Sequence, residues 1–444
     1  MCIRDRYTFS STADFIAGRV QNFSAQLPGS VPEKGLRQTL GAGYILDDWK
    51  ARKNLTLNLG VRYEATSVPT EVHGNLSRLV NLTDSAPTLG GTYFQNPTLK
   101  DFEPRVGVVW DPFSTGKTAI RAGFGMFDVL PLPYQFELLS SLAAPYLAVG
   151  SVVYSNAAAP YTAVQPGDGK FAHGSFAAIQ APSTLRQSYI QPNPSRSYLM
   201  EWNLNVEQDL GHSMSLYVGF VGSKGVHQPF RSDELNTVQP LGVLNGQLTF
   251  PKPGTAPVLN PNVGQIAGIL YNNNTYYDGL QAGFNKKLSH GLQAQVSYTF
   301  SKAIDLGSAV VAGDPFGNSI SGLFFFAPYT RKGVADFNVP NEFTFNLLYQ
   351  VPEFKSLRGP LDVIGNGWQA SSIFFAQNGL PFTPTIAGDE LGLKGTAPYN
   401  VPNRIKSGGC STGVVGRQAN GYINLNCFTF PSPNANGTTV YGNA

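Results

Sequence analysis

Long hydrophobic runs are missing from this sequence. None of its 444 residues falls in an apolar stretch of 18 or more, whereas a membrane-spanning helix needs about 20 apolar residues. If the chain crosses a membrane, it must therefore do so with β-strands. Charge is scarce as well, because Asp, Glu, Lys and Arg make up 13% of the residues, about half of the roughly 25% usual for soluble domains.

Sequence patterns that carry chemistry are also lacking. The net charge of +3 is spread along the chain without a Lys/Arg cluster, which excludes the electrostatic footprint of a nucleic-acid-binding protein. No spacing of Cys and His resembles a zinc site. Residues 221–225 are similar to a G-x-S-x-G nucleophile elbow, but Val221 replaces its first glycine. We predict that the chain is not an enzyme and has no catalytic residue, no cofactor and no metal site.

Cysteine is rare, with three residues in the chain. Cys2 stands alone, whereas Cys410 and Cys427 lie close together in a Gly/Asn/Ser-rich segment near the end. An extracytoplasmic compartment permits a disulfide between this pair. The alternative is two reduced cysteines.

A secretory signal is not visible at the start of the chain. Residues 1–6 have neither the apolar segment nor the small-residue cleavage site of such a signal, although strand-like sequence begins at residue 7. We expect residues 1–6 to be a non-native leader of a truncated gene product.

What the sequence does contain is a recurring pair of amphipathic strands. In residues 292–300, Leu, Ala, Val, Tyr and Phe alternate with Gln, Ser and Thr, which is the period of a strand with one apolar and one polar face. Short turns join the first four pairs, and a longer Pro/Gly-containing link joins the fifth. The predicted strands cover residues 38–49 and 54–65, 102–111 and 117–127, 198–209 and 214–223, 277–288 and 292–302, and 341–351 and 367–377.

Long connections follow every second strand: residues 66–101, 128–197, 224–276, 303–340 and everything after 378. A soluble sandwich has no reason to alternate short and long connections so regularly. A bacterial outer-membrane barrel does, because short turns lie at its periplasmic rim and long loops at its extracellular rim. The pattern therefore predicts an all-β fold, a partial transmembrane antiparallel β-barrel with long extracellular loops and short periplasmic turns.

Several short segments carry a more specific signal. They are GYILDDW (43–49), LTLNLGVRYE (55–64), FEPRVG (102–107), RAGFG (121–125), EWNL (201–204), YVGFVGSKG (217–225), SYTFSKA (297–303), WQA (368–370) and GLPFT (379–383). In this order they resemble the barrel region of Oar-like TonB-dependent outer-membrane receptors, a family with a carboxypeptidase-regulatory-like domain. The resemblance covers residues 7–444.

The resemblance implies a carboxypeptidase-like β-sandwich, a plug domain and a barrel of about 22 strands, energised through a TonB box. Residues 7–444 would supply about half of that barrel, with the plug and the C-terminal strands missing. The expected partners are outer-membrane lipid, the TonB complex through the missing N-terminal region, and an unknown extracellular ligand, with no nucleic acid.

Polar side chains on the wet face of the strands are the candidate contacts with a plug or a passing substrate. A solvated lumen wall without substrate specificity is the alternative role for each of them. The predicted lumen-facing residues are Arg62, Glu64, Arg121, Asn203, Asn205, Glu207, Gln293, Gln295, Thr344 and Asn346.

We therefore expect a fragment of a TonB-dependent receptor in the outer membrane of a Gram-negative bacterium, for uptake of a large ligand such as an oligosaccharide or a peptide. The size of the ligand is inferred from the length of the loops alone. The alternatives are a passive porin or surface adhesin, which uses the same barrel without energy coupling, and a secreted, soluble β-rich binding protein.

Overall fold

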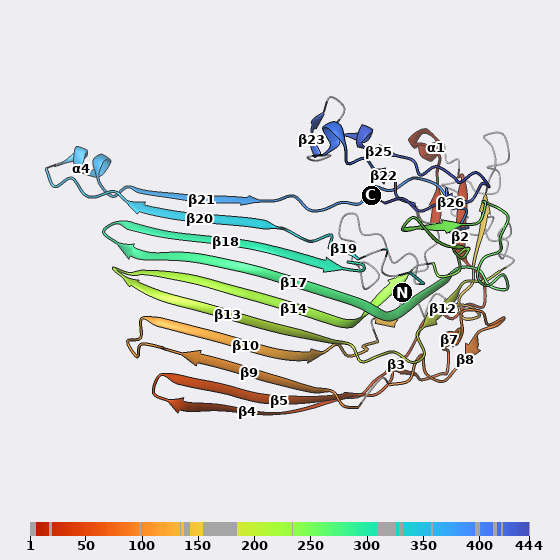
Figure 1. The fold of residues 1–444 in the computed structure, drawn as a ribbon, viewed down its shortest axis with the longest axis horizontal. Helices are drawn as coiled ribbons and strands as arrows, with labels where there is room; N and C mark the ends of the chain where they lie inside the picture. The colour runs from red at the N-terminus through yellow and green to blue at the C-terminus, as the bar shows by residue number, and fades with distance from the viewer. Residues whose placement is uncertain are drawn as a thin grey trace.

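A large curved antiparallel sheet dominates the protein (Figure 1). The computed structural model describes residues 6–16, 20–96, 99–133, 135–136, 143–153, 184–232, 234–308, 326–327, 330, 332–356, 358–395, 400–411, 415–418 and 421–443. Within these ranges, no helix has the length and hydrophobicity needed to cross a bilayer. Residues 1–5, and with them most of the expected leader, lie outside the described residues, while Arg6 opens the short strand β1 (Arg6–Thr8).

The sheet follows the chain from strand to strand. Its order is β21-β20-β18-β17-β14-β13-β10-β9-β5-β4, and every neighbouring pair is antiparallel. The five predicted strand pairs are confirmed. Their bounds are β4 (Leu40–Arg52), β5 (Leu55–Thr66), β9 (Phe102–Trp110), β10 (Thr118–Asp128), β13 (Tyr198–Gly211), β14 (Met214–Ser232), β17 (Ile266–Ser289), β18 (Leu292–Asp305), β20 (Asn341–Gln350) and β21 (Gln369–Gln377).

Short turns join the strands of the first four pairs at one rim of the sheet (Figure 1). Between β17 and β18, His290 and Gly291 have φ values of 52° and 75°, and between β13 and β14, His212 and Ser213 have φ values of 53° and 63°. Two consecutive positive φ angles match the twist of the flanking strands, so such turns close hairpins tightly. The link between β20 and β21 differs, because it contains a short helix, α4 (Pro360–Gly365).

The two faces of the sheet have opposite character, and the residue registers show it directly. Cross-strand partners lie on the same face, so a row of partners can be followed from strand to strand. One row is apolar: Leu57, Val108, Ala122, Leu204, Phe220, Leu280 and Phe300. The neighbouring row, on the opposite face, is mostly polar: Thr56, Val109, Arg121, Asn205, Gly219, Gln281, Thr299, Glu342 and Gln377.

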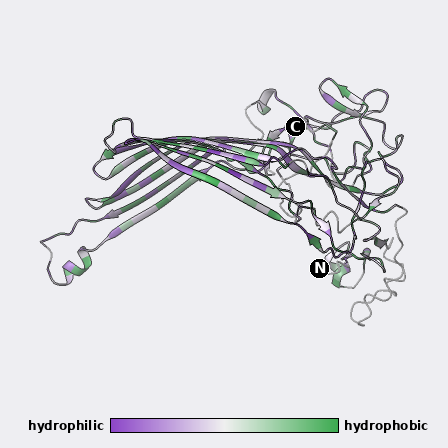
Figure 2. Cartoon of the chain, turned by 90° about the horizontal axis from the view of Figure 1, so that it is seen from below, coloured by the Kyte–Doolittle hydropathy of each residue, from purple (hydrophilic) through white to green (hydrophobic). Residues whose placement is uncertain are grey.

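The apolar face is exposed, as a surface that meets lipid must be. Leu204 is 52% exposed and Phe300 54% exposed, although both lie in the middle of long strands. Figure 2 shows the alternation of hydrophobic and hydrophilic residues along the strands, and the curvature of the sheet. The architecture is thus a partial transmembrane β-barrel whose sheet is not closed, with one apolar and one polar face.

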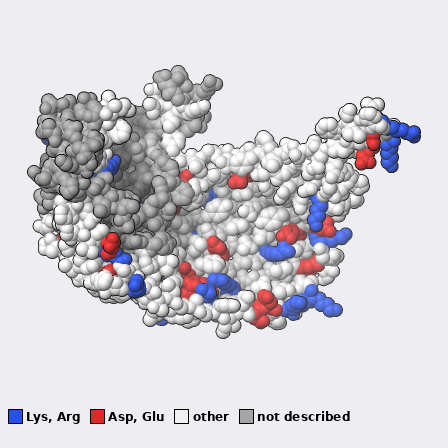
Figure 3. All heavy atoms as spheres, turned by 180° about the vertical axis from the view of Figure 1, so that it is seen from behind, with Lys and Arg blue, Asp and Glu red and all other residues white. Residues whose placement is uncertain are grey.

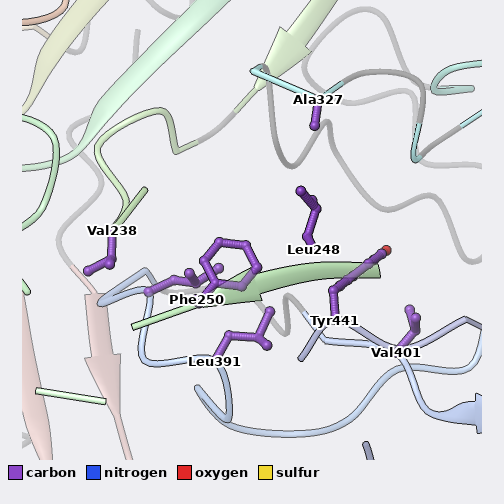
Figure 4. Close-up of a cluster of buried hydrophobic side chains, with 8 residues drawn as sticks. Val238, Leu248, Phe250, Ala327, Leu391, Val401 and Tyr441 are labelled. Atoms are coloured by element: carbon purple, nitrogen blue, oxygen red, sulfur yellow. The ribbon is translucent and has the colours of Figure 1, made fainter. Parts of the chain in front are cut away.

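The buried core lies at the other rim, among the long connections. β14 and β17 extend past the predicted ends at 223 and 277, and β17 there also pairs in parallel with β12 (Gln187–Ile190). One cluster of buried apolar side chains is shown in Figure 4, and it brings together residues far apart in the sequence. Its members include Val238, Leu248, Phe250, Ala327, Leu391, Val401 and Tyr441.

The long connections are therefore folded wherever the structure describes them. They contain short strands such as β15 (Gly242–Leu244), β16 (Gln247–Phe250) and β26 (Thr439–Val440), which form a small sheet. From the sequence, these segments are predicted only as long connections, with no strand within them. Apolar residues of these Gly- and Pro-rich segments are buried by tertiary packing. Their sequence has no regular periodicity from which this burial could be predicted.

Candidate functional site

The ten predicted polar residues all lie on one face of the sheet. The register makes Arg121 the cross-strand partner of Asn205, Glu207 the partner of Ala119, and Gln295 the partner of Asn346. Following the pairs across the sheet places the other members on the same side. This geometry makes them one surface, which we call the polar face. Its role as the lining of a lumen stays a prediction.

Charged side chains of both signs are grouped over the strands near β4 (Figure 3). Arg62 Nε donates to Glu64 Oε1 at 2.6 Å, and Arg105 Nη2 lies 3.0 Å from Glu103 Oε2. Glu103 is buried, with 2% of its surface exposed, and its other oxygen accepts from the backbone N–H of Asp128 at 2.9 Å. Glu103 is thus held in place by a backbone donor and by an arginine of its own strand.

A second charged group lies beside it, at the rim formed by the long connections. Arg196 donates from Nε and Nη2 to the two carboxylate oxygens of Asp128 at 2.7 and 2.8 Å, and its Nε lies 3.6 Å from Asp101. Such a two-point pair of arginine and carboxylate fixes orientation as well as charge. It ties the connection that enters β13 to the end of β10.

Asp101 is the unusual member of this group. Burial raises the pKa of its carboxyl, and the negative charge of Asp128 raises it further, to about 6. The attraction of Arg196 opposes the rise without cancelling it. Asp101 lies just before β9, outside the strand, at the connection-bearing rim.

Uncharged polar side chains continue the polar face across β13, β14 and β17. The Tyr217 hydroxyl lies 3.1 Å from both Asn205 Oδ1 and Gln281 Oε1, and Asn205 Nδ2 donates to Asn203 Oδ1 at 3.1 Å. On the neighbouring strands Arg121 pairs with Glu207, and both side chains are nearly half exposed. The result is a hydrogen-bonded wall that spans four strands, from β10 to β17.

Glycine lets these side chains lie flat on the sheet. A Cβ atom at Gly219 would meet Asn205 Oδ1 and, at 2.5 Å, the Tyr217 hydroxyl. Asn203 lies in the same way against Gly123, where a Cβ would come within 3.0 Å of its Nδ2. These two strand glycines therefore mark places where a neighbouring side chain covers the backbone.

Sequence reasoning missed several members of the polar face. Glu103 and Arg105 lie on it because Glu103 pairs with Arg62 and Arg105 with Gly60. Their alternation within a predicted strand was the available signal. Asp101 and Arg196 lie in connections, where no periodicity exists to place them.

The cysteine pair lies in the last connection. A disulfide joins Cys410 and Cys427, whose Cα atoms are 5.5 Å apart. Ile405 and Phe428 pack against it. Elsewhere in the described part of the chain, no group of three or more His, Cys, Asp or Glu residues is placed to hold a metal ion.

An antiparallel sheet with an exposed apolar face, a polar face and short turns along one rim defines a transmembrane β-barrel protein. The chain belongs to the outer membrane beta barrel domain family, whose model matches residues 3–444. The protein is accordingly located in the outer membrane. No curated protein matches the chain.

Solved structures of outer-membrane proteins are similar to part of the chain. The outer membrane transporter YddB from Escherichia coli has 14% identity and a TM-score of 0.41 over 75% of this chain and 33% of that one. The pyoverdine outer membrane receptor FpvA from Pseudomonas aeruginosa has 12% identity and a TM-score of 0.35 over 77% and 35%. The ferric enterobactin receptor PfeA from the same organism has 12% identity and a TM-score of 0.36 over 75% and 36%. The chain thus spans about a third of the length of these proteins.

Proposed function

We propose that the chain supplies part of the wall and the extracellular connections of an outer-membrane receptor that takes up a large ligand by energy coupling. The observation that carries the proposal is the polar face, with its charged groups and its hydrogen-bonded wall, on a sheet whose other face is apolar. A wall of this kind suits an aqueous or plugged lumen. The ten predicted residues would then face the plug or the passing ligand.

Energy coupling is the finer part of the proposal. It is supported by the resemblance of segments such as 43–49 and 217–225 to Oar-like TonB-dependent receptors. In such a receptor, a plug upstream of the barrel closes the lumen and the TonB complex displaces it. The ligand class, an oligosaccharide or a peptide, is proposed from the length of the connections that would capture it.

An uptake assay tests the proposal. Bacteria that express the full-length protein would receive fluorescent oligosaccharides and peptides of about 1–2 kDa, too large for general diffusion pores, and accumulation would be followed in cells with and without TonB. We expect accumulation of one probe class that depends on TonB and is abolished by a protonophore. Accumulation in both strains would indicate a passive porin, and surface binding without accumulation an adhesin; either result overturns the proposal.

A further inference from the structure

Three lysines lie on the apolar side of the sheet, near the rim that bears the long connections. Lys224 (β14) and Tyr276 (β17) are cross-strand partners, and Tyr276 is also the partner of Ile304 in β18. Lys302 is two residues from Ile304 and shares its face. Lys332, just before the short strand β19 (Gly333–Val334), approaches the same tyrosine. We call Lys224, Lys302 and Lys332 the lysine cluster.

Tyr276 organises the cluster. The Nζ atoms of Lys224 and Lys332 lie 5.5 and 4.9 Å from the centre of its ring, within the range of cation–π attraction. Two ammonium groups around one ring repel each other, and Lys302 adds a third positive charge nearby. Asp278, the cross-strand partner of Lys302, brings one carboxylate on this face. Asp305 belongs to the opposite face of β18, where it lines a pocket together with Lys332 and Asp336.

The distance of the lysine cluster from the apolar row indicates which part of the bilayer the cluster faces. Along β17, Leu280 belongs to the apolar row, Asp278 follows two residues closer to the connections, and Tyr276 two residues further still. Each step of two residues is about 7 Å. The surface therefore changes from apolar to positively charged over the depth at which a bilayer changes from acyl chains to headgroups.

The indole ring of Trp202 lies at the same height along the strands as Asp278. Trp202 is the cross-strand partner of Gly222, and its ring covers that glycine so closely that a Cβ there would collide with it. Gly222 in turn pairs with Asp278. Trp and Tyr side chains are enriched where a membrane protein crosses the interface between lipid and water.

We propose that the lysine cluster binds the phosphate of a phosphorylated glycolipid in the outer leaflet of the outer membrane. The charge is complementary to phosphate, and anionic headgroups are recognised by clustered Lys and Arg beside the membrane-spanning region. The apolar row of Leu204, Phe220, Leu280 and Phe300 continues directly below and receives the acyl chains. This lipid site depends on the outward orientation of the face and is independent of the proposed uptake.

Binding of purified lipid A to the full-length protein in detergent tests the proposal, with bound lipid measured by native mass spectrometry. The wild-type protein should bind bis-phosphorylated lipid A, and the triple variant Lys224→Gln, Lys302→Gln, Lys332→Gln should bind it at least about tenfold more weakly. Lipid A without its phosphates should bind both proteins equally weakly. Equal binding of phosphorylated lipid A to both proteins would overturn the proposal.

Two controls separate charge from folding and from position. The variant with arginine at the three positions keeps the charge and should retain binding, whereas loss of binding in it would argue against a phosphate site. Lys50→Gln, Lys53→Gln, Lys286→Gln removes the same charge near the opposite rim and should bind like wild type. Competition by inorganic phosphate at the same concentration as the lipid would point to a site for soluble anions and overturn the lipid assignment.

Discussion

Glu103 is the buried centre of the charged group on the polar face. It combines 2% exposure with a backbone donor and Arg105. Replacing its buried carboxylate by an amide removes charge-assisted hydrogen bonds, although the Arg105 side chain is itself 43% exposed and stays solvated. The exposed pair of Arg121 and Glu207 is different, because water already solvates both side chains.

Replacement of Glu103 should therefore destabilise the protein more than replacement of Glu207. We expect Glu103→Gln to lower the free energy of unfolding by about 1.5–3 kcal/mol, through its lost charge-assisted hydrogen bonds, and Glu207→Gln by at most about 1 kcal/mol. Equilibrium unfolding in urea, with the full-length protein in lipid vesicles, measures both. Equal effects of the two variants would show that Glu103 is not specially held.

Asp101 should make stability depend on pH. Its pKa is raised from 3.8 to about 6 in the folded protein, so between these values the folded state binds a proton that the unfolded state has released. Stability from this group is therefore greatest below pH 4 and declines as the pH rises from about 4 to about 6.

The variant Asp101→Asn should remove that decline. The measurement is the urea midpoint of wild type and variant between pH 4 and pH 8, with the difference between them largest at the high end. A difference that does not change with pH would mean that Asp101 keeps an ordinary pKa.

At the scale of elements, neighbouring strands pack closely where a large side chain lies over a glycine. Gly219 and Gly283 both lie on the polar face beside Tyr217: Gly219 is two residues further along β14, and Gly283 is the cross-strand partner of Tyr217 in β17. A Cβ at Gly283 would make ordinary contacts of 3.6 Å or more, whereas a Cβ at Gly219 would collide with Asn205 and the Tyr217 hydroxyl. The same substitution should therefore have different effects at the two positions.

We expect Gly219→Ala to lower the free energy of unfolding by about 1 kcal/mol, because the Cβ would displace Asn205 and the Tyr217 hydroxyl and break their hydrogen bond. Gly283→Ala should change it by about 0.5 kcal/mol or less. The same urea titration measures both, and the gel mobility of the unheated protein reports whether each barrel has folded. A larger loss at Gly283 would contradict the packing described for Tyr217.

The elements also show how far sequence reasoning reached. The ten long strands were predictable because alternation is local and each turn carries its own signal. The extension of β14 was not, because the pairing shifts between Gly225 and Gln228 and His227 has a positive φ of 51°. Such a bulge breaks the alternation, and Pro229 just after it further disguises the strand.

At the scale of the whole molecule, the sheet and the connections are stabilised in different ways. The sheet leaves both faces exposed, so its environment must supply lipid on one side. The connections bury their own apolar clusters, one of which contains Phe250 and Leu391. The disulfide of Cys410 and Cys427 lies beside a smaller cluster of its own.

Loss of the disulfide should therefore act locally. The variant Cys410→Ser, Cys427→Ser removes a link across a sequence separation of 17 residues, worth about 3 kcal/mol by loop-closure entropy. Limited proteolysis should cut residues 400–430 faster, while the mobility of the unheated barrel stays that of wild type. Loss of the folded barrel would show that the last connection supports the sheet.

The sequence by itself determined the class of fold, the ten strands and the residues of each face, because a strand of period two carries its own orientation. Which polar residues meet was decided by tertiary structure. Arg196 reaches Asp128 and Val238 packs near Leu391 only after distant connections fold together. The lysine cluster depends on three strands and one connection. Contacts of this kind depend on the register between strands and on which distant connections pack together. The alternation of residues within one strand does not specify either.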